Sequence, residues 1–329
     1  MKLASIRQAS RVALIVELPD GGAALLEDLY RAAALGEAPA SLQALIERGD
    51  AEVVRLRAAL PLHASRLPLV ALESVDWLAP QPRTGKILGI AVNNRNLNRV
   101  AFREPTHPMI FMKSSTSLTG HQKPIEILQD HGYTIPEPEL CAVLGKGGKN
   151  IAEKDALSCV FGYTITNDIT ASGVKFSMDS VALNIGAQNM RPHHTVWREK
   201  HGPDDGFLYF TYHTRSKASD TFSPMGPWLT LAADVPDPNK LAVRSWVNGE
   251  LYTEDSTANY LFPLQRCIAE ASRFLTLEAG DIIHFGTAGA GTEKFPMGNR
   301  SVNLFEMDGA TVDVEFEGLG RLSNVVKRI

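Results

Sequence analysis

YTIPEPELCAVLG, residues 133–145, places Glu137 and Glu139 at the start of an apolar run that predicts a buried strand. Side chains two apart in a strand point to the same face, so both carboxylates are expected side by side, with Pro138 turned the other way. Like charges that close repel each other. The pKa of one carboxyl is therefore expected to rise unless a cation lies between the two.

A third carboxylate, Asp168, ends another strand-like run, FGYTITND, at residues 161–168. Three carboxylates around one point suit a hard cation such as Mg²⁺, Mn²⁺ or Ca²⁺. The alternative is that Glu137 and Glu139 form a solvated edge face. Spacing alone favours this alternative, because Glu-x-Glu is a common pattern.

The composition is that of an ordinary soluble globular protein. A chain of 329 residues with a net charge of −4 argues against a general nucleic-acid binder, which usually shows a basic face. No run is apolar and long enough to span a bilayer, and the N-terminus lacks the order of a signal peptide, so a cytoplasmic location is expected. Cys141, Cys159 and Cys267 share no metal-type spacing, and buried free thiols are expected.

Turn signals divide the chain into a small leading domain, residues 1–79, and a larger one, residues 83–329, with Pro80-Gln81-Pro82 at the boundary. Residues 41–59 predict a helix with Ser41 as its N-cap. Many short strands follow the boundary, among them one at residues 301–307, and a hairpin turn is expected at Asn248-Gly249. The larger domain is therefore expected to be rich in β-structure.

An inserted segment around residues 175–214 breaks the alternation of strands and contains His193, His194 and His201. It is expected to be either a lid or arm over the site, or a surface insertion that packs on a partner subunit. The strand at residues 282–286 leads into the small-residue loop TAGAG, residues 287–291. The backbone N–H groups of such a loop can approach a carboxylate or phosphate closely.

From about Lys86 to the C-terminus the sequence resembles the fumarylacetoacetate hydrolase family. The matching segments, in family order, are PMIFMKSSTSLTG, EPELCAVLGKGGKNIAEKDALSCVFGYTITND, SKASDTFSPMGPWL, VNGE and LEAGDIIHFGTAGAG. The resemblance implies an α+β fold rich in strands, with a mixed β-roll or barrel catalytic domain and a small N-terminal α/β domain. It also implies a divalent metal, usually Mg²⁺ with Mn²⁺ as the alternative, a homodimer, and small oxo-acid substrates.

The family motifs transfer residue by residue. Glu137 and Glu139 match the Glu-x-Glu metal ligands, and Asp168 matches the third ligand. Lys217, in SKASDTF, matches the lysine beside the metal, which can stabilise an enolate or a carboxylate. Thr287, in the pair Gly286-Thr287, matches the threonine that holds a substrate carboxylate, although Ala288 replaces the usual proline.

Other positions have a role that the resemblance leaves open, or depart from the family pattern. Lys113 matches a common family lysine, with a role open between structure and substrate contact. The family usually reads Asn-Tyr-x-x-His-x-x-Glu after the first core strand, and its His–Glu pair activates water. Leu97 and Val100 stand at those two positions, and neither can move a proton. Asn96 stands where some members carry a metal-binding Asp, and Ser172 replaces a frequent Arg. Arg95, Asn96 and Gly286 are further candidates for substrate binding, and specificity is expected to rest on residues 95–103 and 178–212.

The resemblance predicts a metal-dependent hydrolase that cleaves a C–C bond in a small 1,3-dicarbonyl or 2-oxo acid. Hydrolysis needs an activated water, so the base must come from His193, His194 or His201, or from a metal-bound hydroxide. Decarboxylation or dehydration needs mainly a metal that stabilises the enolate, and it is the alternative reaction. A different class of function is a family member that binds metal but has lost catalysis.

Overall fold

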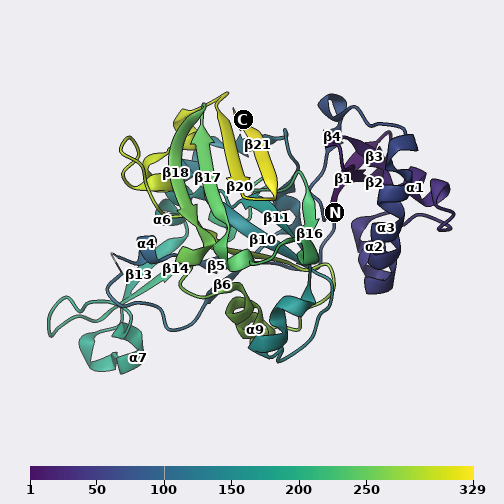
Figure 1. Ribbon diagram of the computed structural model, residues 1–329. Helices are drawn as coiled ribbons and strands as arrows, with labels where there is room; N and C mark the ends of the chain where they lie inside the picture. Colours follow the sequence, from purple (N-terminus) through teal and green to yellow (C-terminus); the bar gives the residue numbers. More distant parts are fainter. Residues whose placement is uncertain (100) are drawn as a thin grey trace.

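The computed structural model describes residues 1–99 and 101–329, and two large sheets dominate it (Figure 1). The ten-stranded sheet follows the order β3 (Ala23–Leu25), β2 (Arg11–Glu17), β1 (Lys2–Gln8), β16 (Leu229–Leu231), β11 (Val160–Asn167), β10 (Pro138–Leu144), β19 (Ile282–Thr287), β5 (Ile87–Ala91) and β6 (Met109–Lys113), with β4 (Asp76–Trp77) beside β1. The five-stranded sheet follows the order β18 (Glu250–Ser256), β17 (Ala242–Val247), β20 (Thr311–Phe316), β21 (Gly320–Arg328) and β8 (Pro124–Ile127).

Both sheets are mixed, because β19 runs parallel to β5, and β21 runs parallel to β8. Neither sheet closes into a barrel within the residues that the structure describes. Three short pairs complete the strands: β9 (Thr134–Ile135) with β12 (Thr170–Ala171), β7 (Leu118–Thr119) with β15 (Ser223–Pro224), and β13 (Ser180–Asn184) with β14 (Phe207–Thr211). The expected strand-rich α+β fold is confirmed in this open form.

The main hydrophobic core fills the space between the two sheets. Strand β10 is buried along its whole length, and alternate residues such as Leu140 and Ala142 face this core. Val314 and Phe316 of the five-stranded sheet meet them. Helix α9 (Leu264–Phe274) covers the core with Cys267 and Ile268. All three cysteines are free and buried, as expected. None of the described helices is long and apolar enough to cross a membrane.

The leading segment adds helices α1 (Leu26–Ala32), α2 (Leu42–Glu47) and α3 (Asp50–His63) to one end of the molecule (Figure 1). Its strands continue the large sheet, because Lys2 pairs with Thr230 of β16. Ser41 caps α2 by accepting the Ala44 N–H at 3.2 Å, as expected. The single helix predicted at residues 41–59 is wrong: Gly49 has φ of 75°, which ends one helix and starts the next. The division into domains stays a prediction.

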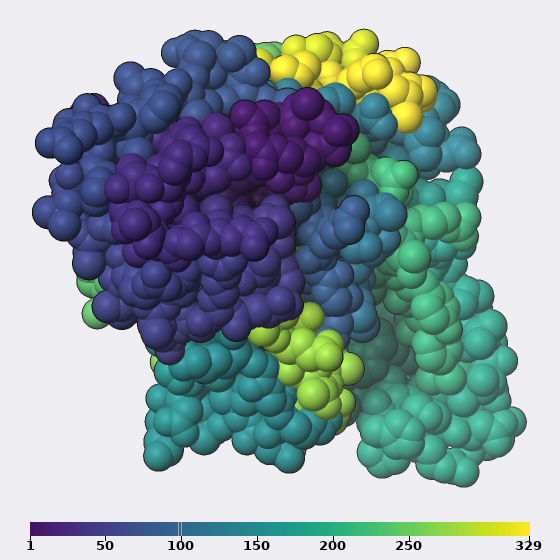
Figure 2. Space-filling view, turned by 90° about the vertical axis from the view of Figure 1, so that its right-hand side faces the viewer, coloured from purple at the N-terminus to yellow at the C-terminus, as the bar shows by residue number. Residues whose placement is uncertain are grey.

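The inserted segment forms an arm at the end opposite the leading helices (Figures 1 and 2). It starts at α6 (Ser172–Ser177), runs out along β13, passes α7 (Pro192–Thr195), and returns along β14 to α8 (Thr214–Lys217). Figure 2 shows the arm, in teal to green, as a lobe set apart from the rest of the surface. Helices α6 and α8, at the root of the arm, lie against each other.

Local structure explains one further correction. The Asn248-Gly249 turn joins β17 and β18, with φ of 50° and 77°, as expected. Residues 301–307, predicted as a strand, instead form 3-10 turns. Their N–H groups bond locally, for example from Met307 to the Leu304 carbonyl, while Val302 and Leu304 are buried. Two buried residues at a spacing of two therefore mimic the strand pattern. The remaining short helices are α4 (Arg95–Asn98) and α5 (Glu153–Ala156).

Candidate active site

The three predicted carboxylates meet because β10 and β11 are antiparallel neighbours. Pro138 pairs with Asn167, and the Asp168 N–H donates to the Glu137 carbonyl at 2.8 Å. The Asn167 side chain accepts the Glu137 N–H at 2.7 Å. The start of β10 and the end of β11 are thus tied together, so that Glu137, Glu139 and Asp168 leave the sheet at the same edge.

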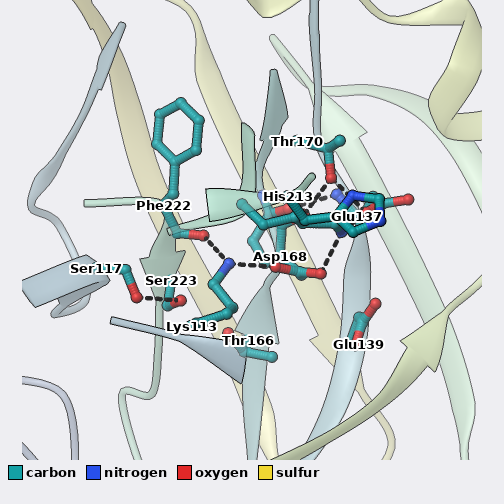
Figure 3. Close-up of polar contacts among 12 residues, drawn as sticks. Lys113, Ser117, Glu137, Glu139, Thr166, Asp168, Thr170, His213, Phe222 and Ser223 are labelled. Carbon is teal, nitrogen blue, oxygen red and sulfur yellow. Dashed lines mark hydrogen bonds and ion pairs between the residues drawn. The ribbon is translucent and has the colours of Figure 1, made fainter. Parts of the chain in front are cut away.

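Two lysine ammonium groups neutralise part of this acidic cluster, and Figure 3 shows the contacts of Lys113. Lys113, from β6, pairs with one oxygen of Asp168 and donates to the Phe222 carbonyl at 2.9 Å. Lys217, from α8, pairs with the other oxygen of Asp168 and with Glu137. Burial alone would raise the pKa of Asp168, but Lys113 and Lys217 hold this pKa well below its usual range.

The charge state of both lysines follows from their surroundings. Burial alone would lower the pKa of Lys217, yet the carboxylates of Asp168 and Glu137 outweigh burial and raise it. Lys217 is therefore a permanent cation in the site at neutral pH. Lys113 is completely buried, and desolvation lowers its pKa. Lys113 thus holds Asp168 from the inner side, which favours a structural role for this lysine.

Glu139 and His284 lie beside this ion-paired group, and neither forms an ion pair with another described residue. The Glu139 carboxylate accepts the Gly286 N–H at 3.0 Å. Burial, followed by repulsion from Asp168 and Glu137, raises the pKa of Glu139 well above its usual range. Both ring nitrogens of His284 are buried without a hydrogen-bond partner among the described residues.

These groups fit a divalent cation. One donor atom each from Glu139, Asp168 and His284 lies within 4.8 Å of the others. A cation there would stabilise the ionised form of Glu139 and give one nitrogen of His284 a partner. Sequence reasoning missed His284, although a polar ring inside the apolar strand IIHFG was a usable signal. Glu137 lies outside this group and instead accepts from Lys217 and, at 2.6 Å, from the Thr170 hydroxyl. Its role as a ligand stays a prediction.

A cavity of about 1130 Å³ opens over the cluster. Glu137, Glu139, Lys217 and Thr287 line it, so the structure brings four of the predicted residues to one space. Gly286 contributes its backbone N–H to Glu139, as described. The cavity wall also includes several apolar residues and three basic side chains besides Lys217: Ile90, Leu97, Ile110, Phe111, Ile135, Lys175, His213 and Arg300.

His213 is the histidine that reaches the cavity, within the part of the chain that the structure describes; His193, His194 and His201 do not line it. The His213 ring centroid lies 6.4 Å from that of Phe111, and the Lys217 ammonium lies 5.1 Å above the same Phe111 ring. Burial, then repulsion from Lys175 and Lys217, lowers the pKa of His213, so its imidazole is neutral at pH 7. The sequence signal that could have found it is its position four residues before Lys217.

Residues 93–97, directly after β5, include no side chain that can transfer a proton. Leu97 lines the cavity and packs on Gly289, where a Cβ atom would lie 2.7 Å from the Leu97 Cγ. Arg95 donates to the carbonyls of Ala258 and Tyr260, and neither Arg95 nor Asn96 lines the cavity. A substrate-binding role for these two residues stays a prediction without a supporting contact. Val100 lies outside the described residues.

The loop TAGAG does not offer all its N–H groups to a ligand, because Asp255 of β18 takes two of them. Its carboxylate accepts the N–H of Gly289 at 2.8 Å and of Ala290 at 3.1 Å. The same oxygen accepts the Asn94 side chain at 3.0 Å. The small residues of this loop allow its N–H groups to approach an external anion, but two of the five hold an internal carboxylate instead.

Comparisons with known proteins show the family of the chain and support its fold. Residues 86–327 match the family described as fumarylacetoacetate (FAA) hydrolase C-terminal. Oxaloacetate tautomerase YisK of Bacillus subtilis is 32% identical over 302 residues, which span 88% of this chain and 87% of that protein. Among solved structures, a fumarylacetoacetate hydrolase from Exiguobacterium antarcticum is 27% identical and covers 100% of both chains, with a TM-score of 0.70.

A second solved structure supports the fold alone. Maleylpyruvate hydrolase from Sphingobium sp. SYK-6, in complex with manganese(II) ion and pyruvate, is 24% identical over 100% of this chain and 99% of that chain, with a TM-score of 0.70.

Proposed function

The chain belongs to the fumarylacetoacetate hydrolase family, and we propose that it transfers a proton within a small 2-oxo acid held beside a divalent cation, as a keto–enol tautomerase. The observation that supports this most is the composition of the cavity wall. A neutral imidazole, His213, and a permanent cation, Lys217, face the space next to Glu139, while Leu97 stands at the position of the water-activating histidine.

The cation would be held by Glu139, Asp168 and His284, with Glu137 as the further predicted ligand. When bound, it supplies a Lewis acid that makes the carbon next to the keto group more acidic. A donor set that combines carboxylates with an imidazole suits Mn²⁺ at least as well as Mg²⁺. We therefore propose Mn²⁺ as the preferred ion, in place of the Mg²⁺ that the family resemblance favours.

The chain's own residues then account for the proton transfer. Neutral His213 takes the proton from the carbon next to the keto group, and the Lys217 ammonium stabilises the negative charge that develops on the oxygen. The resulting imidazolium returns the same proton to that oxygen, which completes the enol. Thr287, at the cavity wall beside Gly286, holds the carboxylate of the substrate.

Hydrolysis of a C–C bond, predicted from the sequence, is the second candidate. It starts from a similar electron sink and needs a water activated by His213 or by the cation. The cavity of about 1130 Å³ leaves room for an acyl chain and a water, which supports this candidate. A decarboxylase would use the same site without an activated water.

One experiment distinguishes these reactions. Purified protein with Mn²⁺ or Mg²⁺ is incubated with enol-oxaloacetate and, separately, with an acylpyruvate, and products are followed by absorbance and NMR. Loss of the enol signal without CO₂ release or acyl cleavage, abolished by EDTA, is the expected result. Acyl cleavage would identify a hydrolase, and CO₂ release a decarboxylase. Absence of any turnover in protein with bound metal would overturn the enzyme proposal and support a binding role.

A further inference from the structure

Two cations in the cavity wall have no ion-pair partner among the described residues. Lys175 lies on α6, and Arg300 lies in the 3-10 turn Gly298–Ser301; both line the cavity that Glu137, Glu139 and Lys217 also line. Within the described ranges, 1–99 and 101–329, neither side chain forms an ion pair. Lys217, in contrast, pairs with two carboxylates. The cavity therefore holds more positive charge than its own carboxylates compensate.

The two cations are close enough to disfavour each other. Burial lowers the pKa of Lys175, and repulsion from Lys217 and Arg300 lowers it further, against the attraction of Glu137. Lys175 keeps its ammonium over the Phe176 ring, 5.3 Å from the centroid. Holding two unpaired cations around one cavity costs free energy, which an anionic ligand between them would offset.

The backbone fixes both residues in place. The Lys175 carbonyl accepts the Ser180 hydroxyl at 2.9 Å, at the root of the arm. The Arg300 carbonyl accepts the hydroxyl of Tyr133, another residue of the cavity wall.

We infer that Lys175 and Arg300 form a subsite for a second carboxylate, so that the substrate is a dicarboxylic 2-oxo acid. This inference rests on the proposed function, which places the 2-oxo acid group at Lys217 and Thr287. The second carboxylate then lies toward the arm, between the Lys175 ammonium and the Arg300 guanidinium. A guanidinium can bind a carboxylate through two N–H groups, which gives the subsite direction as well as charge.

The test compares oxaloacetate with its 4-methyl ester, which keeps the 2-oxo acid group and removes the second charge. Lys175→Met and Arg300→Met are each expected to lower kcat/KM for oxaloacetate by about 10- to 100-fold, the range for one charge-assisted hydrogen bond. Turnover of the ester should stay within about threefold of that of the unmodified protein. Lys175→Arg should restore most of the loss. Lys200→Met, at an exposed lysine of the arm, is the control for a change in net charge.

Three outcomes would overturn the subsite: equal losses for both substrates, no loss for either, or the same loss in Lys200→Met. Calorimetric titration of the Mn²⁺-loaded protein with 2-oxoglutarate and its 5-methyl ester tests it without catalysis. Weaker binding of the diacid alone in Lys175→Met would support the subsite even if no variant turned over any substrate. In that case the proposed reaction would fail while the subsite stood. Equal binding of both ligands by the unmodified protein would overturn it.

Discussion

The backbone nitrogen of Gly289 lies 2.8 Å from a carboxylate oxygen of Asp255, so the loop after β19 is anchored by the protein's own acid. The same oxygen accepts the side chain of Asn94, which starts the short helix α4 with Leu97 at the cavity. Asp255 therefore fixes the position of the loop after β19 relative to the start of α4. This arrangement makes Asp255 a positioning residue at a distance from the reacting atoms.

Asp255→Asn should loosen both segments, because a neutral amide accepts the N–H groups of Gly289 and Ala290 less strongly. We expect a loss of about 1 to 3 kcal/mol in the free energy of unfolding, measured by urea denaturation. Asp204→Asn, at an exposed aspartate of the arm, should change the free energy of unfolding by less than about 0.5 kcal/mol. Unchanged stability in Asp255→Asn would show that the anchor is dispensable.

His213→Gln should lower kcat by about 100-fold or more, because a positioned general base contributes about 10² to 10⁴. His193→Gln, at an exposed histidine outside the cavity, is the matched control and should leave kcat unchanged. Retained activity in His213→Gln would refute its role in proton transfer.

The dependence of kcat/KM on pH gives a second test of His213. Its pKa is lowered from the ordinary value of 6.5 by burial and by the cations Lys175 and Lys217, so the base form persists to lower pH. The acid limb of the profile should therefore have its midpoint below 6.5. Removing the positive charge in Lys175→Met should move that midpoint upward. An acid-limb midpoint that is the same in Lys175→Met and in the unmodified protein would point to another base.

His284 should leave a signature in the bound metal. Electron spin-echo spectroscopy of the Mn²⁺ protein should show coupling to a nitrogen nucleus, and His284→Phe should remove this coupling. The same substitution should weaken Mn²⁺ binding by about tenfold or more, with a smaller effect on Mg²⁺, because imidazole is a poorer ligand for the harder ion. An unmodified protein without nitrogen coupling would place His284 outside the coordination sphere.

Acid should destabilise the fold through His121, away from the site. Its Nδ1 accepts the Ser323 N–H at 3.0 Å, its ring packs on Trp77, and burial lowers its pKa from 6.5 to about 4. Between these two values the unfolded chain binds a proton that the folded protein does not bind. Stability should therefore fall as pH decreases from 6.5 to about 4, by up to about 3 kcal/mol.

His121→Asn keeps an acceptor for the Ser323 N–H and removes the titrating ring. Urea denaturation at several pH values should show a shallower decline for this variant than for the unmodified protein. Parallel curves for the two proteins would assign the acid sensitivity to other groups.

The sequence predicts the acidic centre well, because its signals are local. The i, i+2 spacing at Glu137 and Glu139 and the strand that ends before Asp168 are both visible in the chain, and the structure brings these residues together. Lys217 was found by its motif. Burial is the main cause of the rise in the pKa of Glu139, and the repulsion expected between neighbouring carboxylates adds to it.

The missed features depend on contacts between distant segments. His284 and Asp168 meet only once β10, β11 and β19 are neighbours in the sheet, and no spacing in the chain encodes that meeting. The small residues at 287–291 left the N–H groups of this loop open to an external anion, but Asp255, more than thirty residues earlier, occupies two of them. His213 was overlooked in favour of three other histidines of the same insertion. None of these three lines the cavity.

The arm is closed at its base, where Ser180 pairs with Thr211 and their hydroxyls lie 2.9 Å apart. Lys175 precedes this closure and Lys217 follows it. The spacing between these two cations is consequently set by the root of the hairpin and is independent of how many residues lie beyond it. The tip of the arm should therefore tolerate shortening, extension or replacement by another sequence. The positions of Lys175 and Lys217 at the root would not change.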